Sequence, residues 1–551
     1  MGTGNQNPLW KHEGFSSPEE AAEAFALQCQ KEPQNPDVFF QMGTALEASG
    51  EFDGAMRSFQ HARRLCSDHA NATLAGCYLL LRFNRQAELR NWIRTSPLLQ
   101  SHAEIQTIYA ETCLNCGDYA ECIAFLEKRP ELLRNPRTAA VQIRAMVYDP
   151  AATAETLYNA AMRWASMHAA VEPLPAAVVR ENDPDRQLRI GFVGTRMSLH
   201  NSSTHLLNLL RHTNKEEFET VLYSDTPICD ARTDELRAVA DLWRDIHTMS
   251  AREAAELIRA DEIDVLVELH EFSNDARLQI FAYKPVPVQV HWYANATTTG
   301  VAAIDWRVTS RMADPPENDV FSSEKPLYVP SYYLYSPSPM AQNTKPNTVP
   351  PSQKNGYITF GAIHHFAKYN PQVLNAWRQI LDQLPDARLL IGRSDLQTTT
   401  AQSMLREYFK NHGIDPQRVD MEGNPDKIAS LEIFNRIDIV LDSFPFNGAA
   451  TTSDTLWMGV PLITLKGGRT ATRHAADQLQ LVGHPEWIAE TESEYVEKAV
   501  ALARDFQGLE KARRTLRDEF AASPICQHKQ TAVGIYEALR QAWRASQGSE
   551  K

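Results

Sequence analysis

The sequence has 551 residues, a length that accommodates about three or four domains with ample core. Hydrophobic residues make up 43% of the chain and charged residues 23%, as in soluble globular proteins. The formal net charge of -14 argues against a nucleic-acid partner, because proteins of that kind present a basic face to phosphates.

No apolar run reaches the ~18 residues that a membrane-spanning helix needs. The first residues, MGTGNQNPLWKHEG, lack the charged and then apolar pattern of a secretory signal, so we expect a cytoplasmic protein. Eight cysteines do not make a disulfide framework in a chain of this size. Cys113, Cys116 and Cys122 cluster, but a second ligand pair at zinc-binding spacing is missing, so we interpret them as small residues packed between helices.

Helical repeats are predicted within residues 1–150. Residues 36–69 follow the tetratricopeptide pattern, a helix-turn-helix unit of about 34 residues with fixed large and small positions. A preceding copy is indicated by Ala21 and Phe25, a later one by the segment 109–126, and the unit between them is degenerate. We predict an α-solenoid of about three to four repeats, whose concave face would bind peptides; a generic helical bundle is the alternative.

Residues 151–186 predict a helix, at 152–168, and then a linker that contains several prolines. Asp183-Pro184-Asp185 in this linker has the form of an acidic D-x-D metal motif. It lies in a polar loop before any strand, however, so we interpret it as a turn.

From Leu188 onward apolar strands alternate with helices, which predicts two doubly wound parallel sheets in series, at 187–340 and 341–551. Two such domains would enclose a ligand-binding cleft. No G-x-G-x-x-G follows the first strand, which counts against a dinucleotide-dependent oxidoreductase. The expected strands are 188–193, 220–223, 263–268, 288–291 and 306–309 in the first sheet, and 357–362, 388–391, 418–421, 439–441 and 462–465 in the second.

The stretch 438–467 joins the last two strands and is the most informative part of the chain. Asn447 and Gly448 form a turn, and a helix is expected from Thr451 to Met458, with hydroxyl and acidic side chains in its first turn. A helix that begins at the carboxyl edge of a parallel sheet directs free N–H groups into the cleft, which suits a diphosphate. The alternative is an ordinary capped strand-turn-helix.

The segment FPFNGAATTSDTLWMGVPLITL, residues 444–465, resembles the signature of the O-GlcNAc transferase family. These are SPINDLY-like proteins with tetratricopeptide repeats, glycosyltransferase family 41, and their usual form is close to PYNGGTTTCDALWMGVPVVTL. The resemblance covers most of the chain, from the repeats to about Leu539. It implies an α+α/β architecture, in which a TPR-like α-solenoid precedes a GT-B glycosyltransferase with two Rossmann-like domains.

The resemblance also implies a set of residues that bind a UDP-sugar. Lys368, in FGAIHHFAKYNP, is similar to a family lysine that neutralises the diphosphate, although a lone surface lysine is the alternative. Ala449 and Ala450 depart from the family pattern, so one side-chain contact to the diphosphate is expected to be lost. Further donor-binding candidates are His365, Lys427 for the base, Asn447, Gly448, Thr451, Thr452, Asp454 for the ribose, and Arg473, which is structural or adjacent to the phosphates.

The acceptor side is implied by two segments of the first domain. VGTRMSLHNSSTHL resembles the family's strand-loop with two histidines, which makes His200 a candidate general base or a substrate-positioning residue, with His205 as the second histidine. PVPVQVHWYANATTTG resembles a second family segment through Trp292, Thr298 and Thr299. Its residues 294–297 depart from the family pattern, which leaves the shape of the sugar or acceptor side open.

Together with the residue patterns, the resemblance implies a metal-independent, inverting glycosyltransferase with UDP-sugar as co-substrate and no cofactor. The expected donor is UDP-N-acetylglucosamine, and the expected acceptor is serine or threonine of a protein selected by the repeats, with no nucleic acid or membrane partner. One alternative is transfer of a sugar such as glucose to asparagine, or transfer of another sugar to a bacterial surface protein. A second alternative is a non-catalytic scaffold with a vestigial cleft, favoured by Ala449 and Ala450.

Overall fold

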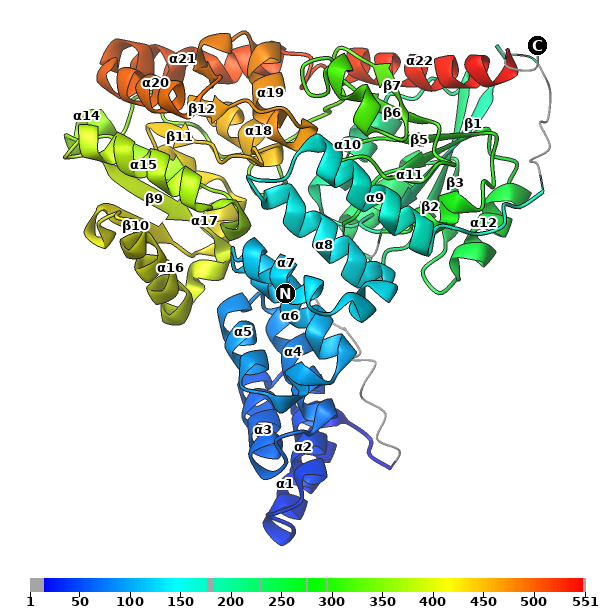
Figure 1. Ribbon diagram of the computed structural model, residues 1–551, viewed down its shortest axis with the longest axis vertical. Helices are drawn as coiled ribbons and strands as arrows, with labels where there is room; N and C mark the ends of the chain where they lie inside the picture. The colour runs from blue at the N-terminus through cyan, green and yellow to red at the C-terminus, as the bar shows by residue number, and fades with distance from the viewer. Residues whose placement is uncertain are drawn as a thin grey trace. The chain divides into compact units, whose positions relative to one another are not determined.

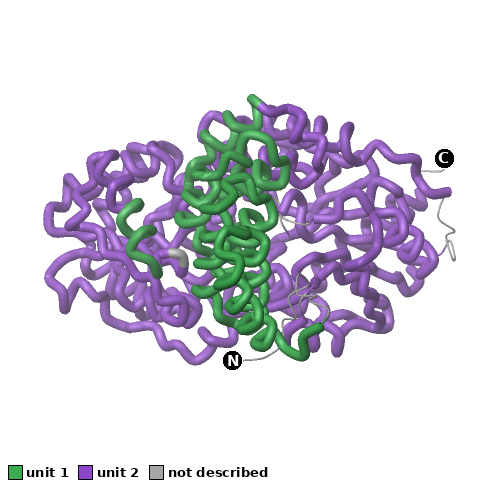
Figure 2. Tube along the Cα trace, turned by 90° about the horizontal axis from the view of Figure 1, so that it is seen from below, with its two compact units in different colours: residues 1–128, 397–405 green, residues 129–396, 406–551 purple. Residues whose placement is uncertain are grey.

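The computed structural model describes residues 14–175, 183, 185–227, 229–273, 276–293 and 296–548 (Figure 1). It consists of two compact units (Figure 2). The first unit comprises residues 1–128 and 397–405, and the second comprises 129–396 and 406–551. None of the described helices is both long enough and apolar enough to cross a membrane.

The first unit is the predicted solenoid of paired helices. Gly43 explains how one pair packs, because a Cβ atom there would lie 2.5 Å from the Phe59 ring. Gly76 stands in the same relation to Trp92 in the next pair, also at 2.5 Å. The small and large positions of the repeat therefore persist in the unit that the sequence shows as degenerate. The helices are α1 (Pro18–Lys31), α2 (Pro36–Ala48), α3 (Phe52–Leu65), α4 (Ala70–Arg82), α5 (Gln86–Arg94), α6 (Ala103–Asn115) and α7 (Tyr119–Glu127).

The second unit contains two parallel sheets, as predicted. The first sheet has the order β3-β2-β1-β4-β5-β6-β7. Its two edge strands, β3 and β7, were not predicted, because neither contains a buried apolar run: β3 has no buried residue and β7 has only Leu327. The strands are β1 (Leu188–Gly194), β2 (Phe218–Ser224), β3 (Leu242–Asp245), β4 (Val265–Glu268), β5 (Val288–His291), β6 (Trp306–Thr309) and β7 (Lys325–Tyr328), and the helices along it are α10 (Asn201–Leu210), α11 (Ala231–Val239), α12 (Ala251–Ala260) and α13 (Leu278–Ala282).

The second sheet has the order β10-β9-β8-β11-β12-β13. Its strand order reverses between β8 and β11, as that of the first sheet does between β1 and β4, and ligands bind at the carboxyl ends of strands at such points. The strands are β8 (Thr359–Ala362), β9 (Arg388–Gly392), β10 (Val419–Glu422), β11 (Ile439–Leu441), β12 (Leu462–Leu465) and β13 (Ile488–Ala489), and the helices are α14 (Ser352–Asn355), α15 (Pro371–Gln383), α16 (Thr399–Asn411), α17 (Pro425–Ala429), α18 (Ala450–Trp457), α19 (His474–Val482), α20 (Glu492–Arg504) and α21 (Phe506–Ala522).

Helix α8 (Pro136–Tyr148) lies in the second unit, although its sequence had placed it with the repeats of residues 1–150. Arg469 holds the end of this helix, because its guanidinium donates to the backbone oxygens of Met146 at 3.4 Å and Asp149 at 3.2 Å. Helix α9 (Ala154–His168), which matches the predicted linking helix, is in the same unit. The apolar face of α8 is thus buried by the sheet domains, a choice that helical periodicity alone does not reveal.

The C-terminal helix α22 (His528–Gln547) packs against the first sheet, although it follows the second sheet in sequence (Figure 1). The Tyr536 hydroxyl lies 2.6 Å from Thr213 Oγ1, and its ring stacks on Phe218 at 4.7 Å. Arg540 donates to the backbone oxygen of Arg186 at 3.0 Å. The last helix of the predicted 341–551 domain therefore belongs structurally to the first sheet.

The D-x-D segment of the linker behaves as the predicted turn in its described residues, Asp183 and Asp185. Asp183 Oδ1 accepts a hydrogen bond from the backbone N–H of Asp185 at 2.9 Å. Asp185 in turn forms an ion pair with Arg544 of α22. Both carboxylates thus have contacts within the linker and α22.

The contact of α9 with the first sheet can be tested at Gly300. Gly300 has φ +71, and a Cβ atom there would lie 2.5 Å from backbone atoms of Ala161 on α9. We expect Gly300→Ala to lower the free energy of unfolding by about 3 kcal/mol or more, because both strain and overlap oppose the methyl group. Chemical denaturation measures this.

Gly356→Ala is the matched control, because Gly356 has φ +77 and nothing within 4 Å of the added atom. It should lose only about 1 kcal/mol from backbone strain. Equal losses in the two variants would contradict the packing of α9 against Gly300.

Candidate active site

Asp442 organises the loop between β11 and α18. It follows β11 directly and is completely buried. Its Oδ1 accepts hydrogen bonds from the backbone N–H groups of Ser443 at 2.9 Å and Gly448 at 2.8 Å, while Oδ2 accepts one from the Thr464 hydroxyl on β12 at 2.6 Å. Burial raises the pKa of Asp442 to about 6. The Asp442 carboxylate therefore holds both ends of the loop, a role that was not predicted.

Gly448 allows the loop to close tightly. A Cβ atom on this residue would lie 2.7 Å from Thr452 Oγ1 and 3.3 Å from Asp442 Oδ1. Asn447 is buried, and its Nδ2 donates to the backbone oxygen of Ser443 at 2.9 Å. Gly448 and Asn447, both predicted to bind the donor, therefore have a structural role in shaping the loop.

The start of α18 is open to an anion. Its N-cap is Ala449, and among the residues that the structure describes no side chain caps the helix. The hydroxyls that we expected at the cap bond elsewhere: Thr452 Oγ1 donates to the Gly448 backbone oxygen at 3.0 Å, and Ser453 Oγ donates to Gln478 Oε1 at 2.8 Å. The first N–H groups of α18 and the positive end of its dipole thus remain available for negative charge.

Lys368 reaches the same loop from the second sheet. It ends the short 3₁₀ helix Phe366–Lys368 that follows β8, and its Nζ donates to the Asn447 backbone oxygen at 2.6 Å. The ammonium also lies 4.3 Å from the centroid of the Phe446 ring. Burial lowers the pKa of Lys368 to about 8, although Asp442 opposes this shift. The predicted cation and the start of α18 therefore meet at one loop.

His364 and His365 precede Lys368 and are kept neutral by their surroundings. His365 Nδ1 accepts the Ala367 N–H at 3.3 Å, and His364 Nε2 donates to the Leu441 backbone oxygen at 3.2 Å. Burial lowers the pKa of each imidazole to about 3, with further contributions from the positive charges of Arg393 and Lys368. A neutral His365 leaves Lys368 as the cation beside Asn447.

Asp454 contacts the segment that joins the two sheets. Its Oδ1 accepts a hydrogen bond from the Tyr335 hydroxyl at 2.7 Å, and burial raises the pKa of Asp454 to about 6. Thr451, one turn earlier on α18, is half-buried. The roles of Asp454 toward ribose and of Thr451 toward the diphosphate stay predictions.

Arg473 joins the two sheet domains. Its Nε donates to the Met312 backbone oxygen at 2.6 Å, and its Nη1 donates to the Gly467 backbone oxygen at 2.9 Å. Both partners are backbone carbonyls, which favours the structural alternative for Arg473. Lys427 is exposed on α17, where its Nζ lies 3.4 Å from Glu422 Oε2. Its contact with a nucleotide base stays a prediction.

His200 lies at the N-cap of α10, after the end of β1. Its Nε2 is 3.0 Å from Arg196 Nη1, and its Nδ1 is 2.8 Å from Ser202 Oγ. A guanidinium can only donate, so Arg196 directs a donor at Nε2, while the backbone N–H of Ser202 donates to Nδ1 at 3.2 Å. Burial, and then the charge of Arg196, lowers the pKa of His200 to about 3. The imidazole is neutral as expected, but its lone pair is already engaged.

His205 and Trp292 support the segment between the two domains. His205 Nδ1 accepts the Leu334 N–H at 2.8 Å, and its ring packs against Tyr293 at 4.2 Å. Trp292 is buried, and its Nε1 donates to the Tyr332 backbone oxygen at 3.4 Å. Both predicted acceptor-side residues thus bind the backbone of this segment.

Thr298 and Thr299 bind a buried carboxylate. Thr298 Oγ1 donates to Glu324 Oε2 at 2.7 Å, and the Thr299 N–H donates to Glu324 Oε1 at 2.9 Å. All three side chains are buried. This contact indicates that the two threonines shape the domain from inside, and any contact with the acceptor stays a prediction.

A buried acid–histidine cluster at the ends of β4 and β5 was not predicted. His291 Nδ1 donates to Glu268 Oε2 at 2.7 Å. Glu271 accepts the Thr297 N–H at 2.6 Å, and burial raises its pKa to about 8. Glu271 and Tyr293 both have positive φ, +50 and +88, a strained conformation that is common at functional sites. The E-L-H-E sequence directly after a buried strand was the available signal.

Within the described ranges, no three His, Cys, Asp or Glu side chains are grouped so that they could hold a metal ion. The clustered cysteines form no disulfide in the described part of the chain, and Cys113 and Cys122 are buried in the solenoid.

The chain is similar to known proteins in sequence and in fold. The model of Glycosyl transferase family 41 matches residues 173–357 and 352–535. The Solanum lycopersicum protein named probable UDP-N-acetylglucosamine–peptide N-acetylglucosaminyltransferase SPINDLY is 32% identical over 412 residues, which are 73% of this chain and 44% of that protein. The corresponding SEC protein of Arabidopsis thaliana is 27% identical over 349 residues, 62% of this chain and 35% of its own length. The chain thus spans less than half the length of these relatives.

A solved structure is similar over most of both chains. It is that of an O-GlcNAc transferase mutant from Thermobaculum terrenum, with 27% sequence identity and a TM-score of 0.83. The match covers 94% of this chain and 98% of that one.

The role of Asp442 in holding the loop predicts a loss of stability on its removal. Asp442→Ala leaves three buried donors without their acceptor, and we expect the free energy of unfolding to fall by about 3 kcal/mol at pH 7. Thr464→Val, which removes only one of the three donors, should cost about 1 kcal/mol. Equal losses, measured by denaturant unfolding, would show that the carboxylate does not organise the loop.

Proposed function

The chain belongs to glycosyl transferase family 41, and from that premise we propose that it transfers N-acetylglucosamine from UDP-N-acetylglucosamine to serine or threonine hydroxyls of a polypeptide. The names of the SPINDLY and SEC relatives support both the donor and the peptide acceptor. The observation that carries the proposal is the 2.6 Å contact between Lys368 Nζ and the Asn447 backbone oxygen, beside the uncapped start of α18.

In the proposed reaction the acceptor hydroxyl attacks the anomeric carbon as UDP leaves, so the configuration at that carbon inverts. Negative charge then develops on the departing diphosphate. Lys368 and the N–H groups at the start of α18 would stabilise this charge, since both are held in place before the substrate binds. Asp442 contributes indirectly, because it holds the loop that carries the Lys368 contact.

We further propose that the reaction needs no metal ion. In a metal-dependent transferase a divalent cation would neutralise the diphosphate, and here Lys368 and the helix dipole occupy that role. His364 and His365 are neutral, so Lys368 is the charged side chain that donates to the Asn447 carbonyl, and it can be replaced.

For His200 we propose positioning of the substrate rather than proton abstraction. Both ring nitrogens face hydrogen-bond donors, Arg196 at Nε2 and the Ser202 backbone N–H at Nδ1, and a base needs a free lone pair. The positive charge of Arg196 would also oppose formation of an imidazolium.

Replacement of Lys368 tests the proposed diphosphate site. We expect Lys368→Ala to reduce kcat/KM by about 10² to 10³ and to weaken UDP binding, because a preorganised charge is lost. Lys511→Ala is the matched control, since it removes an exposed lysine of the same domain, on α21, to which no role is assigned, and it should leave kcat/KM nearly unchanged.

Sugar transfer to a peptide, measured in excess EDTA, and calorimetry with UDP are the readouts. Normal transfer by Lys368→Ala would remove Lys368 from the mechanism. Loss of transfer by the unmodified protein in EDTA would contradict metal independence, and absence of UDP binding would favour a scaffold.

The pH profile tests the protonation states. Lys368 has its pKa lowered to about 8, so it is charged below that pH and loses its proton above it. We expect kcat/KM to fall as the pH rises through about 8, because neutral Lys368 no longer attracts the diphosphate. In Asp442→Asn the fall of kcat/KM should begin at a lower pH, because the charge of Asp442 raises the pKa of Lys368.

His200→Asn should leave the shape of this profile unchanged, because the pKa of His200, about 3, lies below the measured range. A titration that disappears in His200→Asn would instead assign the base to His200.

A further inference from the structure

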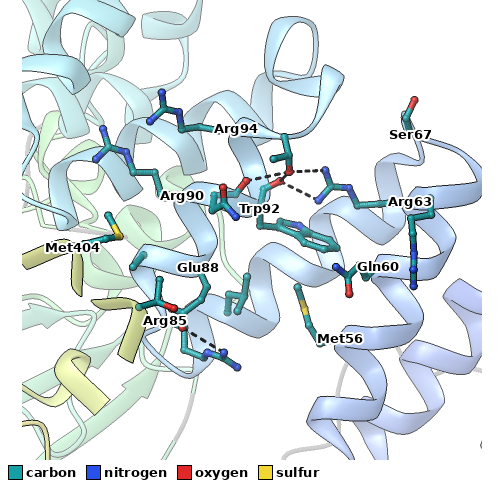
Figure 3. A pocket seen from close by; sticks show the side chains of 16 residues that line it. Met56, Gln60, Arg63, Ser67, Arg85, Glu88, Arg90, Trp92, Arg94 and Met404 are labelled. Carbon is teal, nitrogen blue, oxygen red and sulfur yellow. Dashed lines mark hydrogen bonds and ion pairs between the residues drawn. The ribbon is translucent and has the colours of Figure 1, made fainter. Parts of the chain in front are cut away.

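A pocket on the solenoid is rich in arginine. It is lined by side chains of α3, α4 and α5 and of the turns between them, together with Thr400 and Met404 of α16, which belong to the same unit. Figure 3 shows Trp92 at its centre with Arg63 beside it. We call it the arginine pocket, because its lining includes Trp92 and five arginines: Arg63, Arg64, Arg85, Arg90 and Arg94.

The local charge of this region opposes that of the whole chain. Residues 56–95 contain seven arginines, no lysine and only two acidic residues, Asp68 and Glu88, whereas the chain has a net charge of -14. Five of those seven arginines line the pocket. Positive charge is therefore concentrated at one place on an otherwise acidic protein, which is typical of a site for a local negative partner.

The floor of the arginine pocket is held rigidly. Trp92 Nε1 donates to the Thr73 backbone oxygen at 2.9 Å, and the indole fits against Gly76 so closely that a Cβ atom there would overlap it. The Arg63 guanidinium lies 3.9 Å above the Trp92 ring and donates to the Trp92 backbone oxygen at 3.0 Å. A planar cation stacked on an aromatic ring keeps donors at its edge for a carboxylate.

The five arginines differ in how far their charge is already compensated. Arg90 contacts Asp118 and Glu121, each at 2.7 Å, and Arg85 lies 3.4 Å from Glu88. For Arg64 and Arg94, both exposed, no ion pair occurs among the described residues. The negative partner would therefore be bound mainly by Arg64 and Arg94, with Arg63 on the floor.

We propose that the arginine pocket binds an acidic segment of a polypeptide, rich in aspartate or glutamate. Arginine pairs with carboxylates through two parallel hydrogen bonds, and three guanidiniums around one aromatic floor suit several carboxylates on a short segment. The net charge of -14 favours a short peptide segment over a nucleic acid, whose phosphates would extend over the acidic remainder of the surface. That the segment belongs to an acceptor of sugar transfer rests on the proposed function.

Binding of a model peptide tests this proposal without sugar transfer. The probe is a fluorescein-labelled peptide of alternating glutamate and serine, compared with the same peptide carrying glutamine for glutamate, in an anisotropy titration of the full chain. We expect only the glutamate peptide to bind, with an affinity that falls as salt rises because ions screen exposed charges.

Charge reversal locates the site. We expect the double variant Arg64→Glu with Arg94→Glu to bind the peptide at least about tenfold more weakly than the unmodified chain does. The double variant Arg57→Glu with Arg82→Glu is the matched control, because it makes the same charge change at exposed solenoid residues outside the pocket lining. It should bind as the unmodified chain does.

Equal loss in both double variants, equal binding of the two peptides, or tighter binding of a single-stranded RNA of the same charge would each overturn the proposal. UDP calorimetry on the same proteins separates the two hypotheses. Peptide binding without UDP binding would contradict the proposed function alone, and UDP binding without peptide binding would contradict the arginine pocket alone.

Discussion

The candidate active site depends on one buried carboxylate. Asp442 accepts hydrogen bonds from Ser443, Gly448 and Thr464, and these bonds tie the end of β11, the loop and β12 together. These bonds hold Gly448 in close contact with Thr452. They also keep the start of α18 next to the Asn447 carbonyl, to which Lys368 donates. The position of the cation and the direction of the helix both follow from this network.

This arrangement is electrostatically demanding. Burial raises the pKa of Asp442 and of Asp454 to about 6, so each carboxylate is less stable in the fold than in water. A raised folded-state pKa means that the stabilising contribution is present below the ordinary pKa and is lost as pH rises through about 6. At neutral pH the protein therefore keeps ionised acids in its interior at the expense of stability, a balance often found at functional sites.

Much of the fold could be predicted from local sequence, because periodicity and motif spacing determine elements. The strands Ile439–Leu441 and Leu462–Leu465 agree with the structure, and α18 begins one residue before Thr451. What the sequence could not supply are partners that are distant along the chain. Tyr536 meets Thr213 across 323 residues, and this contact places α22 on the first sheet.

The candidate site shows the same division. Lys368 and the start of α18 come together as their places after buried strands predicted. The hydroxyls of α18 do not cap the helix, because they donate to the Gly448 carbonyl and to Gln478 instead. In the same way, the predicted acceptor-side residue Thr298 donates to the buried Glu324. A motif specifies which residue is present, whereas its role depends on the buried partner that the fold brings to it.

The most direct test of the central claim is a crystal structure of the protein with UDP bound. We expect diphosphate oxygens at about 3 Å from Lys368 Nζ and from backbone N–H groups in the first turn of α18. A diphosphate bound elsewhere, while Lys368 still contacts only Asn447, would contradict it.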